Sequence, residues 1–190
     1  MSCGDAQQDS ESLDDLGREL REKVGREIRR EAEMLEQDAA AVELRRRRIS
    51  DVAIELLSRG DTVTAIAGDR SIRGRLSFAR GQIASIATGT GRVDVHLAAG
   101  VVLRVDERAT EGGSNPRTGS DTLRARLLEH ELAGNDIEVW APAHTIDVNG
   151  AIVAVGTDHL IVQDRDGSEW VLPLGEIAWV RGREPDGSPG

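Results

Sequence analysis

The feature that most constrains this fold is an internal duplication. Residues 50–105 and 122–182 align with an offset of 74 to 76 positions, and short apolar runs with a two-residue period fill both segments. Glycines recur at matching places, as the pairs Gly60 and Gly134, Gly74 and Gly150, Gly81 and Gly156, and Gly91 and Gly167. Because glycine permits turns and sharp bends, matched glycines predict matched turns. The sequence therefore predicts two copies of one β-rich module.

Each copy is predicted to open with a short amphipathic helix and to continue as five strands. The apolar helix positions are Val52, Ala53, Leu56 and Leu57 in the first copy and Leu123, Leu127, Leu128 and Leu132 in the second, where Ser120 or Asp121 can cap. The predicted strands are 62–66, 71–79, 82–88, 92–98 and 101–105, then 137–141, 145–155, 158–164, 169–173 and 177–181.

The last two strands are separated by almost no chain. In VLPLGEIAWVRG, residues 171–182, the apolar pattern breaks at Leu174-Gly175-Glu176 and resumes at once. An ordinary hairpin needs two or more turn residues to reverse direction. The pattern here does not match an ordinary hairpin, and the family resemblance described next implies a single tight turn that feeds one strand directly into the next.

A helix followed by five bent antiparallel strands with this closing turn resembles the Sm-like small barrel of Sm, LSm and Hfq proteins. Ile177 resembles the apolar anchor of the second Sm motif, and Val180-Arg181-Gly182 its hydrophobic-Arg-Gly ending. Gly150 matches the strand bend of the first motif, and Asp158-His159 the loop that contacts RNA in the family. The resemblance covers about 60 residues per copy and implies two tandem five-stranded antiparallel barrels.

The sequence also departs from the family at the positions that contact RNA. Leu174-Gly175 stands where Hfq carries Lys-His, and His159 stands where Sm proteins carry Asn. The first copy has Arg80-Gly81-Gln82 at the loop and Arg104-Val105 in place of Arg-Gly. Base recognition of the family type is therefore not implied.

Ahead of the repeats, residues 11–48 contain no proline and are predicted to form one long amphipathic helix. Its apolar stripe, with charge almost everywhere between, is a candidate protein interface: Leu13, Leu16, Leu20, Val24, Ile28, Leu35 and Val42. The spacing is close to 3.6 residues per turn, which favours a nearly straight helix over a strict heptad zipper. Gly17 and Gly25 weaken the helix, so we expect packing of the coiled-coil kind against a partner to hold it together.

The predicted fold class is thus α+β. The expected segments are a disordered N-terminus (1–10), the long helix (11–48), a first barrel (49–105), a linker rich in Gly and Ser (106–120), a second barrel (121–183) and a disordered tail (184–190).

Composition limits the cores and the compartment. The aromatic residues are Phe78 and three tryptophans, so the cores must be aliphatic, and core packing is the expected role of the tryptophans. Cys3 is the only cysteine, which excludes an intramolecular disulfide. The acidic N-terminus does not resemble a signal peptide, and the sequence has no apolar run long enough to span a membrane. A cytoplasmic protein without membrane contact is expected.

The net charge of −10 is unevenly distributed, at −3 over residues 1–50, +2 over 51–105, −1 over 106–120 and −8 over 121–190. Because nucleic-acid affinity depends on neutralising phosphates, RNA or DNA would bind the first copy if it binds at all. The candidate nucleic-acid contacts are Arg73, Arg75, Arg80 and Arg92, with Asp158, His159 and Arg181 added by the resemblance. The alternative is a solvated surface in an arginine-rich protein from a GC-rich genome, and we favour it.

No chemistry-bearing motif accompanies these features. The four histidines lack metal-ligand spacing, GTGRVD at 89–94 precedes a strand where a phosphate loop precedes a helix, and no nucleophile motif occurs. We therefore expect no catalytic residue, cofactor or metal. The predicted function is a non-enzymatic binding or scaffold protein whose helix contacts itself or another protein. The alternative is an RNA- or DNA-associated regulator that binds through the basic first copy.

Overall fold

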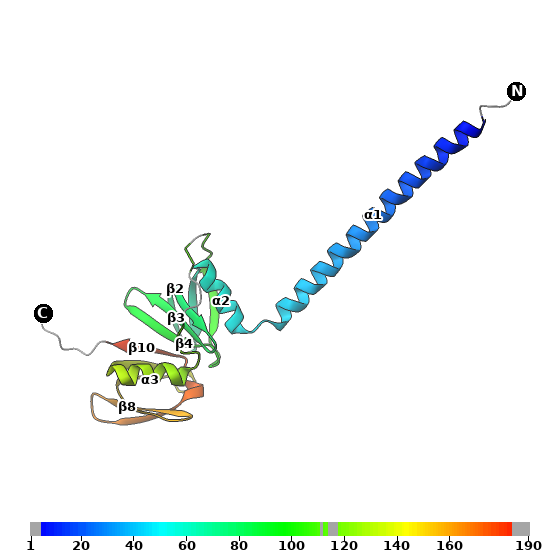
Figure 1. Cartoon of the computed structure of the whole chain (residues 1–190). Coiled ribbons are helices and arrows are strands. Elements are labelled where there is room, and N and C mark those ends of the chain that lie inside the picture. The colour runs from blue at the N-terminus through cyan, green and yellow to red at the C-terminus, as the bar shows by residue number, and fades with distance from the viewer. Residues whose placement is uncertain (1–4, 111, 114–117, 184–190) are drawn as a thin grey trace. The chain divides into compact units, whose positions relative to one another are not determined.

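The computed structural model describes residues 5–110, 112–113 and 118–183, except that the side chains of 5–22, 26 and 40 are not described. The chain divides into two compact units, Met1–Arg47 and Arg48–Gly190. We describe each unit by itself (Figure 1). The predicted disordered tail and part of the predicted linker lie outside the described residues.

The first unit is a single helix, α1 (Asp5–Arg46). It begins six residues before the predicted start, so residues 5–10 are helical, and residues 1–4 lie outside the described residues. The expectation of a coiled coil is wrong for this chain. From Lys23 onward the described side chains of α1 are exposed, apart from the half-buried Gly25, and no second helix of the unit packs along it.

The second unit contains two helices and one ten-stranded antiparallel sheet. The strands are β1 (Thr62–Ala67), β2 (Arg70–Arg80), β3 (Ile83–Thr88), β4 (Gly91–His96), β5 (Val102–Glu107), β6 (Asp136–Ala141), β7 (Ile146–Val155), β8 (His159–Asp164), β9 (Glu169–Pro173) and β10 (Trp179–Arg183). Their spatial order is β5-β1-β2-β3-β4-β10-β6-β7-β8-β9. Each strand lies at its predicted place, with ends shifted by one or two residues at most.

The prediction of two separate five-stranded barrels is wrong. The sheet is continuous and open, because β4 of the first repeat pairs with β10 of the second, with Val180 opposite Asp94. An unpaired strand edge exposes backbone donors and acceptors, and this pairing satisfies them along both strands. The five-strand repeat therefore exists as a sequence unit and not as a closed structural one. The chain is mostly β.

Glycine lets the two longest strands approach their neighbours. A Cβ on Gly74 in β2 would lie 2.2 Å from the Ala87 carbonyl oxygen, and one on Gly150 in β7 would lie 2.0 Å from that of Gln163. Neither glycine has a positive φ, so close backbone approach explains both. Each strand also carries a register shift after its glycine, between Leu76 and Phe78 in β2 and between Ile152 and Ala154 in β7. The matched glycines thus mark matched bends, as the sequence predicts.

Two short helices cover the sheet. Helix α2 (Ile49–Arg59) packs against β2, with Leu56 and Leu57 buried, and ends at Gly60 in the left-handed conformation. Helix α3 (Leu123–Ala133) packs against β7 (Figure 1). Its N-cap is Thr122, whose hydroxyl accepts from the Ala125 amide, and not Ser120 or Asp121 as predicted.

The buried face of α3 also differs from the predicted one. Leu132, expected to be apolar and buried, is 88% exposed. Arg126 and His130 are buried in its place, beside Leu123 and Leu127. These polar side chains face a buried carboxylate across the repeat boundary, as described below.

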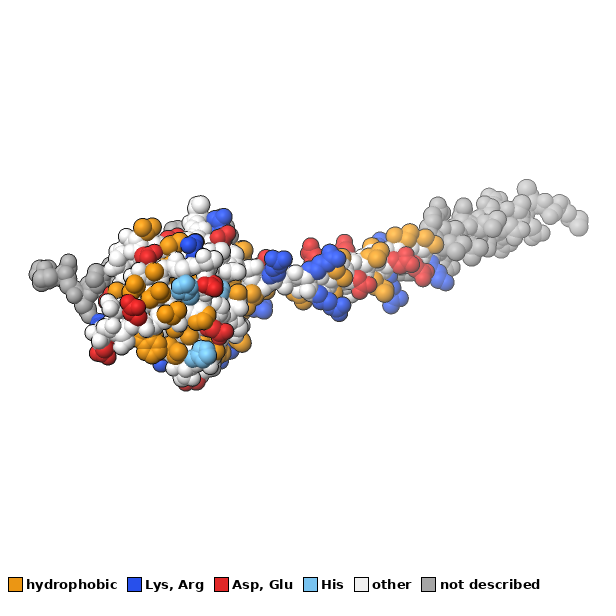
Figure 2. Space-filling model, turned by 90° about the horizontal axis from the view of Figure 1, so that it is seen from below, with side chains coloured by type: hydrophobic (Ala, Val, Ile, Leu, Met, Phe, Trp, Pro, Cys, Tyr) orange, Lys and Arg blue, Asp and Glu red, His pale blue; other side chains and the backbone are white. Residues whose placement is uncertain are grey.

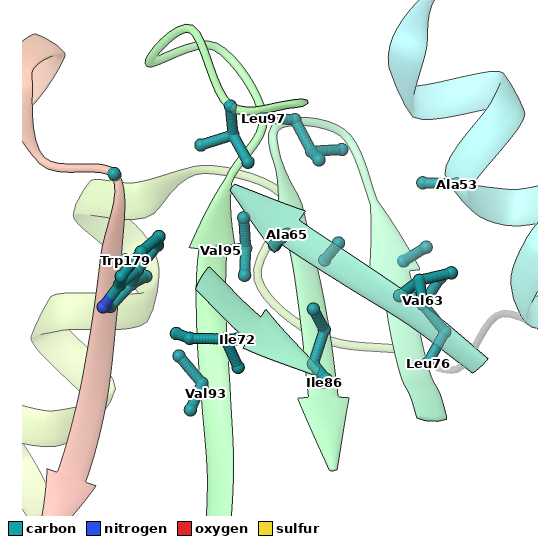
Figure 3. Close-up of a cluster of buried hydrophobic side chains, with 14 of the residues drawn as sticks. Ala53, Val63, Ala65, Ile72, Leu76, Ile86, Val93, Val95, Leu97 and Trp179 are labelled. Atoms are coloured by element: carbon teal, nitrogen blue, oxygen red, sulfur yellow. The ribbon is translucent and has the colours of Figure 1, made fainter. Parts of the chain in front are cut away.

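The two hydrophobic cores each draw on both repeats. The first core, shown in part in Figure 3, combines side chains of the first repeat, among them Val63 and Val95, with Trp179 of β10. Trp140 also belongs to it, 6.2 Å from Trp179 between ring centroids. The second core contains Phe78 from the first repeat. Two of the three tryptophans are thus core residues, whereas Trp170 is 38% exposed.

The interruption at Leu174-Gly175-Glu176 is one turn of 3₁₀ helix, η2, between β9 and β10. Ile177 follows it and is fully buried, so it anchors the turn in the second core. A second 3₁₀ turn, η1 (Pro142–His144), lies between β6 and β7. Strands β9 and β10 do not pair with each other, since they lie apart in the order of the sheet.

Candidate functional site

The four candidate arginines of the first repeat lie on one face of the sheet, and three of them lie close together. Arg75 of β2 and Arg92 of β4 lie opposite the same residue, Ala87 of β3. Arg73 lies two positions from Arg75, and is therefore on the same face of β2. The fourth, Arg80, is exposed at the end of β2 opposite Ile83, four residues along β3 from Ala87. The structure thus gathers Arg73, Arg75 and Arg92 and leaves Arg80 apart.

Carboxylates neutralise much of this face. The Arg73 guanidinium lies 3.2 Å from Asp106 and 2.6 Å from Glu107, and Arg104 lies 2.7 Å from Asp106. A hydrogen bond from Thr64, with further bonds from these arginines, lowers the pKa of Asp106 below its ordinary value. The Asp106 carboxylate is therefore ionised at neutral pH. A phosphate would have to compete with these ion pairs for the guanidinium groups.

The candidates suggested by the Sm-like resemblance lie in two different places. His159 is at the start of β8, where its Nδ1 lies 2.8 Å from the Asp158 carboxylate, and this hydrogen bond lowers the pKa of Asp158. Arg181 of β10 lies opposite Glu138 of β6, near the other end of β8. A strand of this length spans about 16 Å. The structure does not bring Arg181 to the Asp158-His159 pair.

Arg181 instead lines an open cavity of about 690 Å³, together with Thr90, Gly91, Asp136, Arg165, Gly182 and Arg183. Arg181 and Arg183 share one carboxylate, with the guanidinium groups 3.1 and 2.8 Å from Glu138 Oε2. The Arg181 Nε is buried and makes no hydrogen bond. Arg165 and Arg183 lie next to turn and tail residues in the sequence, and no pattern there pointed to this cavity.

A buried polar cluster joins the two repeats. The Ser85 hydroxyl of β3 donates to Asp94 Oδ1 of β4 at 2.5 Å. On its other side, Asp94 Oδ2 lies 3.4 Å from His130 Nε2 and 3.5 Å from Arg126 Nε, both on α3. The Arg126 guanidinium also stacks over the Phe78 ring at 5.2 Å. We name Ser85, Asp94, Arg126 and His130 the junction cluster.

The junction cluster holds an ionised carboxylate in the interior. Burial raises the pKa of Asp94, but the hydrogen bonds from His130 and Ser85 and the charges of Arg126 and Arg92 outweigh it, so the pKa lies below the ordinary value of 3.8. Ser85 donates to Asp94 and not to His130, so the hydrogen bond from serine to histidine that defines a hydrolase triad is not formed. The arrangement supports cohesion of the two repeats and not nucleophilic chemistry.

Sequence reasoning missed the junction cluster. Ser85 and Asp94 occupy positions in strongly apolar strands, and a charged residue in a buried strand requires a partner. This requirement predicts a polar partner for Asp94, but it does not show that α3 supplies that partner. A second hydrogen bond connects the two repeats, because Trp140 Nε1 donates to the Ala67 carbonyl at 2.9 Å.

The candidate helix interface is a stripe on α1. Val24, Ile28, Leu35 and Val42 are 52%, 61%, 69% and 46% exposed. Figure 2 shows hydrophobic side chains among charged ones along the coloured part of this helix. The side chains of Leu13, Leu16 and Leu20 lie outside the described residues, although these positions belong to α1.

Within the described part of the chain, no group of three or more His, Cys, Asp or Glu side chains could hold a metal ion. None of the described helices is both long enough and apolar enough to cross a membrane. Comparison of the chain with protein-family models, with curated proteins and with solved structures gives no significant match.

Proposed function

We propose that this chain is a non-catalytic scaffold, in which the sheet unit is a binding module and α1 supplies a contact for a protein partner. The observation that carries the proposal is the exposed stripe of α1. Four large aliphatic side chains, Val24, Ile28, Leu35 and Val42, follow one line of the helix and are each about half exposed or more. An aliphatic stripe of this kind is stabilised when a partner removes it from water.

The length of α1 supports the same conclusion. Helices in water derive most of their stability from packing of an apolar face and little from propensity alone. Gly25 near the centre of α1 weakens it by roughly 1 kcal/mol relative to alanine. The stripe provides a face for such packing, and the described side chains of α1 have no such contact within their own unit.

Two observations weigh against catalysis as the function. The cavity of the sheet unit is open, and two of its arginines are paired with Glu138. The buried Ser85, Asp94 and His130 are not arranged for proton transfer to a substrate. A binding role requires neither a deep pocket nor an activated nucleophile.

Nucleic-acid binding through the first repeat is the weaker candidate. Arg73 and Arg104 on its arginine face are paired with Asp106 and Glu107. Arg92 lies 3.4 Å from the Asp94 carboxylate, so three positive charges of this face already have a neighbouring carboxylate. Affinity for nucleic acid depends on arginines and lysines that neutralise phosphates. The ion pairs on this face therefore favour the scaffold reading.

The experiment compares three full-length chains by analytical ultracentrifugation over a range of concentrations. The first is the native chain. The second carries Ile28→Ser, Leu35→Ser and Val42→Ser on the stripe. The third carries Met34→Ser and Leu44→Ser, which remove equally exposed apolar side chains (62% and 67%) outside the stripe. We expect the native chain and the Met34/Leu44 variant to associate alike and the stripe variant to be a monomer.

The native chain and a fourth chain, with Arg73, Arg75 and Arg92 changed to alanine, are titrated with a mixed pool of fluorescent oligonucleotides at low salt. Binding that substitution of Arg73, Arg75 and Arg92 by alanine abolishes would overturn the scaffold proposal in favour of the regulator. Equal association of the stripe variant and the native chain would overturn the role assigned to α1.

A further inference from the structure

The charges of α1 occur in blocks of alternating sign. Residues 5–15 carry five carboxylates and no basic side chain, and residues 16–30 carry six basic and three acidic ones. Residues 31–43 again carry five carboxylates and no basic side chain. Arg45 and Arg46 then end the helix, and Arg47 and Arg48 follow it in the sequence. A helix with random charge placement would not separate into such blocks. The order of these blocks determines in which orientation another charged helix can pack alongside α1 without like-charge repulsion.

A second copy of α1 in parallel register would place each block beside an identical one. Acidic residues would face acidic ones at 5–15 and 31–43, and arginines would face arginines at 45 and 46. Like charges on neighbouring positions of paired helices are destabilising. The parallel arrangement is therefore opposed along most of the length of the helix.

The antiparallel arrangement reverses this. When Ile28 of one copy faces Ile28 of the other, position 10 faces position 46, the last residue of α1, and position 15 faces position 41. Arg45 and Arg46 then lie along the acidic block 5–15, and most of the acidic block 31–43 lies along the basic block 16–30. Opposite charges face each other at both ends and beside the centre.

The apolar stripe is nearly symmetric about the same residue. In this register position 13 lies beside Val42, position 16 beside Ala39, and position 20 beside Leu35, each within one residue of exact opposition. Val24 lies opposite Ala32, so a large side chain meets a small one. The register chosen by the charges is thus the register that pairs the apolar positions.

We infer that the partner of α1 is a second copy of this chain, paired antiparallel and centred on Ile28. This inference rests on the proposed function, since it names the partner and orientation for the same stripe. The pairing would bury the stripes of both copies.

The first test reverses the charge of one end. The Arg45→Glu, Arg46→Glu variant would bring carboxylates to the acidic residues 5–15 of an antiparallel partner, so we expect its dimer dissociation constant to rise at least tenfold at low salt. In a parallel pair the same change exchanges one like-charge contact for another, and the constant stays the same. Adding Asp9→Arg and Glu11→Arg to this variant restores opposite charges in the antiparallel pair and should restore the native constant within a few fold.

The second test measures orientation directly. A spin label at Ser12→Cys, in a chain with Cys3→Ser, lies outside the stripe and faces position 44 of the antiparallel partner. Two such labels are separated by 32 residues of helix, or about 48 Å, in the antiparallel pair. They lie within about 20 Å of each other in a parallel pair. Double electron–electron resonance on the full-length chain distinguishes these distances.

The outcomes separate the inference from the proposed function. A distance near 48 Å, with loss of affinity in the Arg45/Arg46 variant and recovery in the four-residue variant, supports the antiparallel pair. A dimer with a short distance, or one indifferent to the end charges, overturns the inference and leaves α1 as the assembly element. A native chain that remains a monomer at every concentration overturns both self-association and the inference.

Discussion

The strand pairs β3–β4 and β8–β9 occupy equivalent places in the two repeats, yet their central residues are opposite in character. Counting from the register shifts in β2 and β7, Ser85 and Asp94 of β3–β4 correspond to Ile161 and Val171 of β8–β9. Asp94 is buried, whereas Val171 is 63% exposed. The charged residue is thus the buried one and the apolar residue the exposed one, which reverses the usual distribution.

The neighbours of each pair explain the reversal. Strand β4 lies inside the sheet, between β3 and β10, and α3 brings Arg126 and His130 to Asp94. Strand β9 is an edge strand and has no such helix against Val171. A buried carboxylate with fixed donors gives a specific contact, because misalignment of the repeats would leave the charge unpaired. The alignment of the two repeats at β4 therefore depends on the positions of polar groups, whereas the edge strand β9 has no such requirement at Val171.

The largest effect is expected from breaking the junction. Asp94→Ala removes the acceptor for Ser85 and His130 in a buried site. It also removes the buried charge beside Arg126, which keeps only its ion pair with the half-exposed Glu129. Removing one partner of a buried ion pair costs about 3–5 kcal/mol. We expect a loss of this size in the free energy of unfolding, measured by urea denaturation with tryptophan fluorescence.

The matched control is Val171→Ala at the equivalent place in β9. Because Val171 is exposed, we expect a loss of less than about 0.5 kcal/mol. Equal losses for the two variants would show that the junction cluster contributes no more than an exposed edge residue, and would contradict the comparison.

The second prediction concerns the feature that the repeats share. Gly150→Ala places a Cβ 2.0 Å from the Gln163 carbonyl oxygen, and Gly74→Ala places one 2.2 Å from that of Ala87. In both, the opposing backbone must move, which costs typically about 1–3 kcal/mol. We expect similar losses of stability in the two variants under the same urea assay. Gly175→Ala, where a Cβ meets nothing within 4 Å, is the control.

The strands and the bends at Gly74 and Gly150 could be predicted because they depend on local pattern and on matched glycines. The pairing of β4 with β10 could not, because two barrels and one continuous sheet use the same alternation of apolar residues. The residues that decide between them, such as Trp179, look like ordinary core positions of a single module. Long-range pairing is thus the part of the fold that periodicity leaves undetermined.

The candidate site was predictable to a similar degree. The stripe of α1 could be predicted from helical spacing. Its described side chains, from Val24 to Val42, are exposed, as expected of a helix face that binds a partner. The arginines of the first repeat could be selected by charge, but the pairing of Arg73 with Asp106 and Glu107 depends on β2 and β5 lying on either side of β1. A carboxylate two strands away in the sheet cannot be recognised from the charges along the sequence.

The third prediction concerns the N-terminal cap of α3, which differs from that of α2. In α3 the Thr122 hydroxyl accepts from the Ala125 amide, whereas in α2 the Asp51 carboxylate accepts from the Arg48 amide at 2.8 Å. Thr122→Ala should cost about 1 kcal/mol of stability, the usual loss for a side-chain cap. Asp121→Ala, at one of the two positions (with Ser120) that the sequence predicted as a cap, should cost less than half as much by thermal denaturation. A larger loss at Asp121 would reassign the cap.

The smallest effect is a pH dependence confined to the first repeat. His96 at the end of β4 is buried, and its Nδ1 donates to the Ile177 carbonyl at 3.2 Å. Burial lowers the pKa of His96 below its ordinary value of 6.5, and the hydrogen bond only partly offsets this. Below pH 6.5 the unfolded chain therefore binds a proton that the folded chain excludes, and the free energy of unfolding falls as the pH falls toward the lower folded pKa. The equivalent position in β9 is Pro173, which cannot titrate.

Substitution of His96 by glutamine tests this asymmetry, because glutamine keeps a donor for the Ile177 carbonyl without a titratable group. We expect the native chain to lose stability between pH 7.5 and pH 5.5 and the His96→Gln variant to lose less over the same range. The His159→Gln variant serves as control, since His159 lies at the start of β8 and is half exposed beside Asp158. A pH slope that His96→Gln leaves unchanged would mean that burial at the end of β4 does not hold the imidazole neutral, and that the two repeats respond to protons alike.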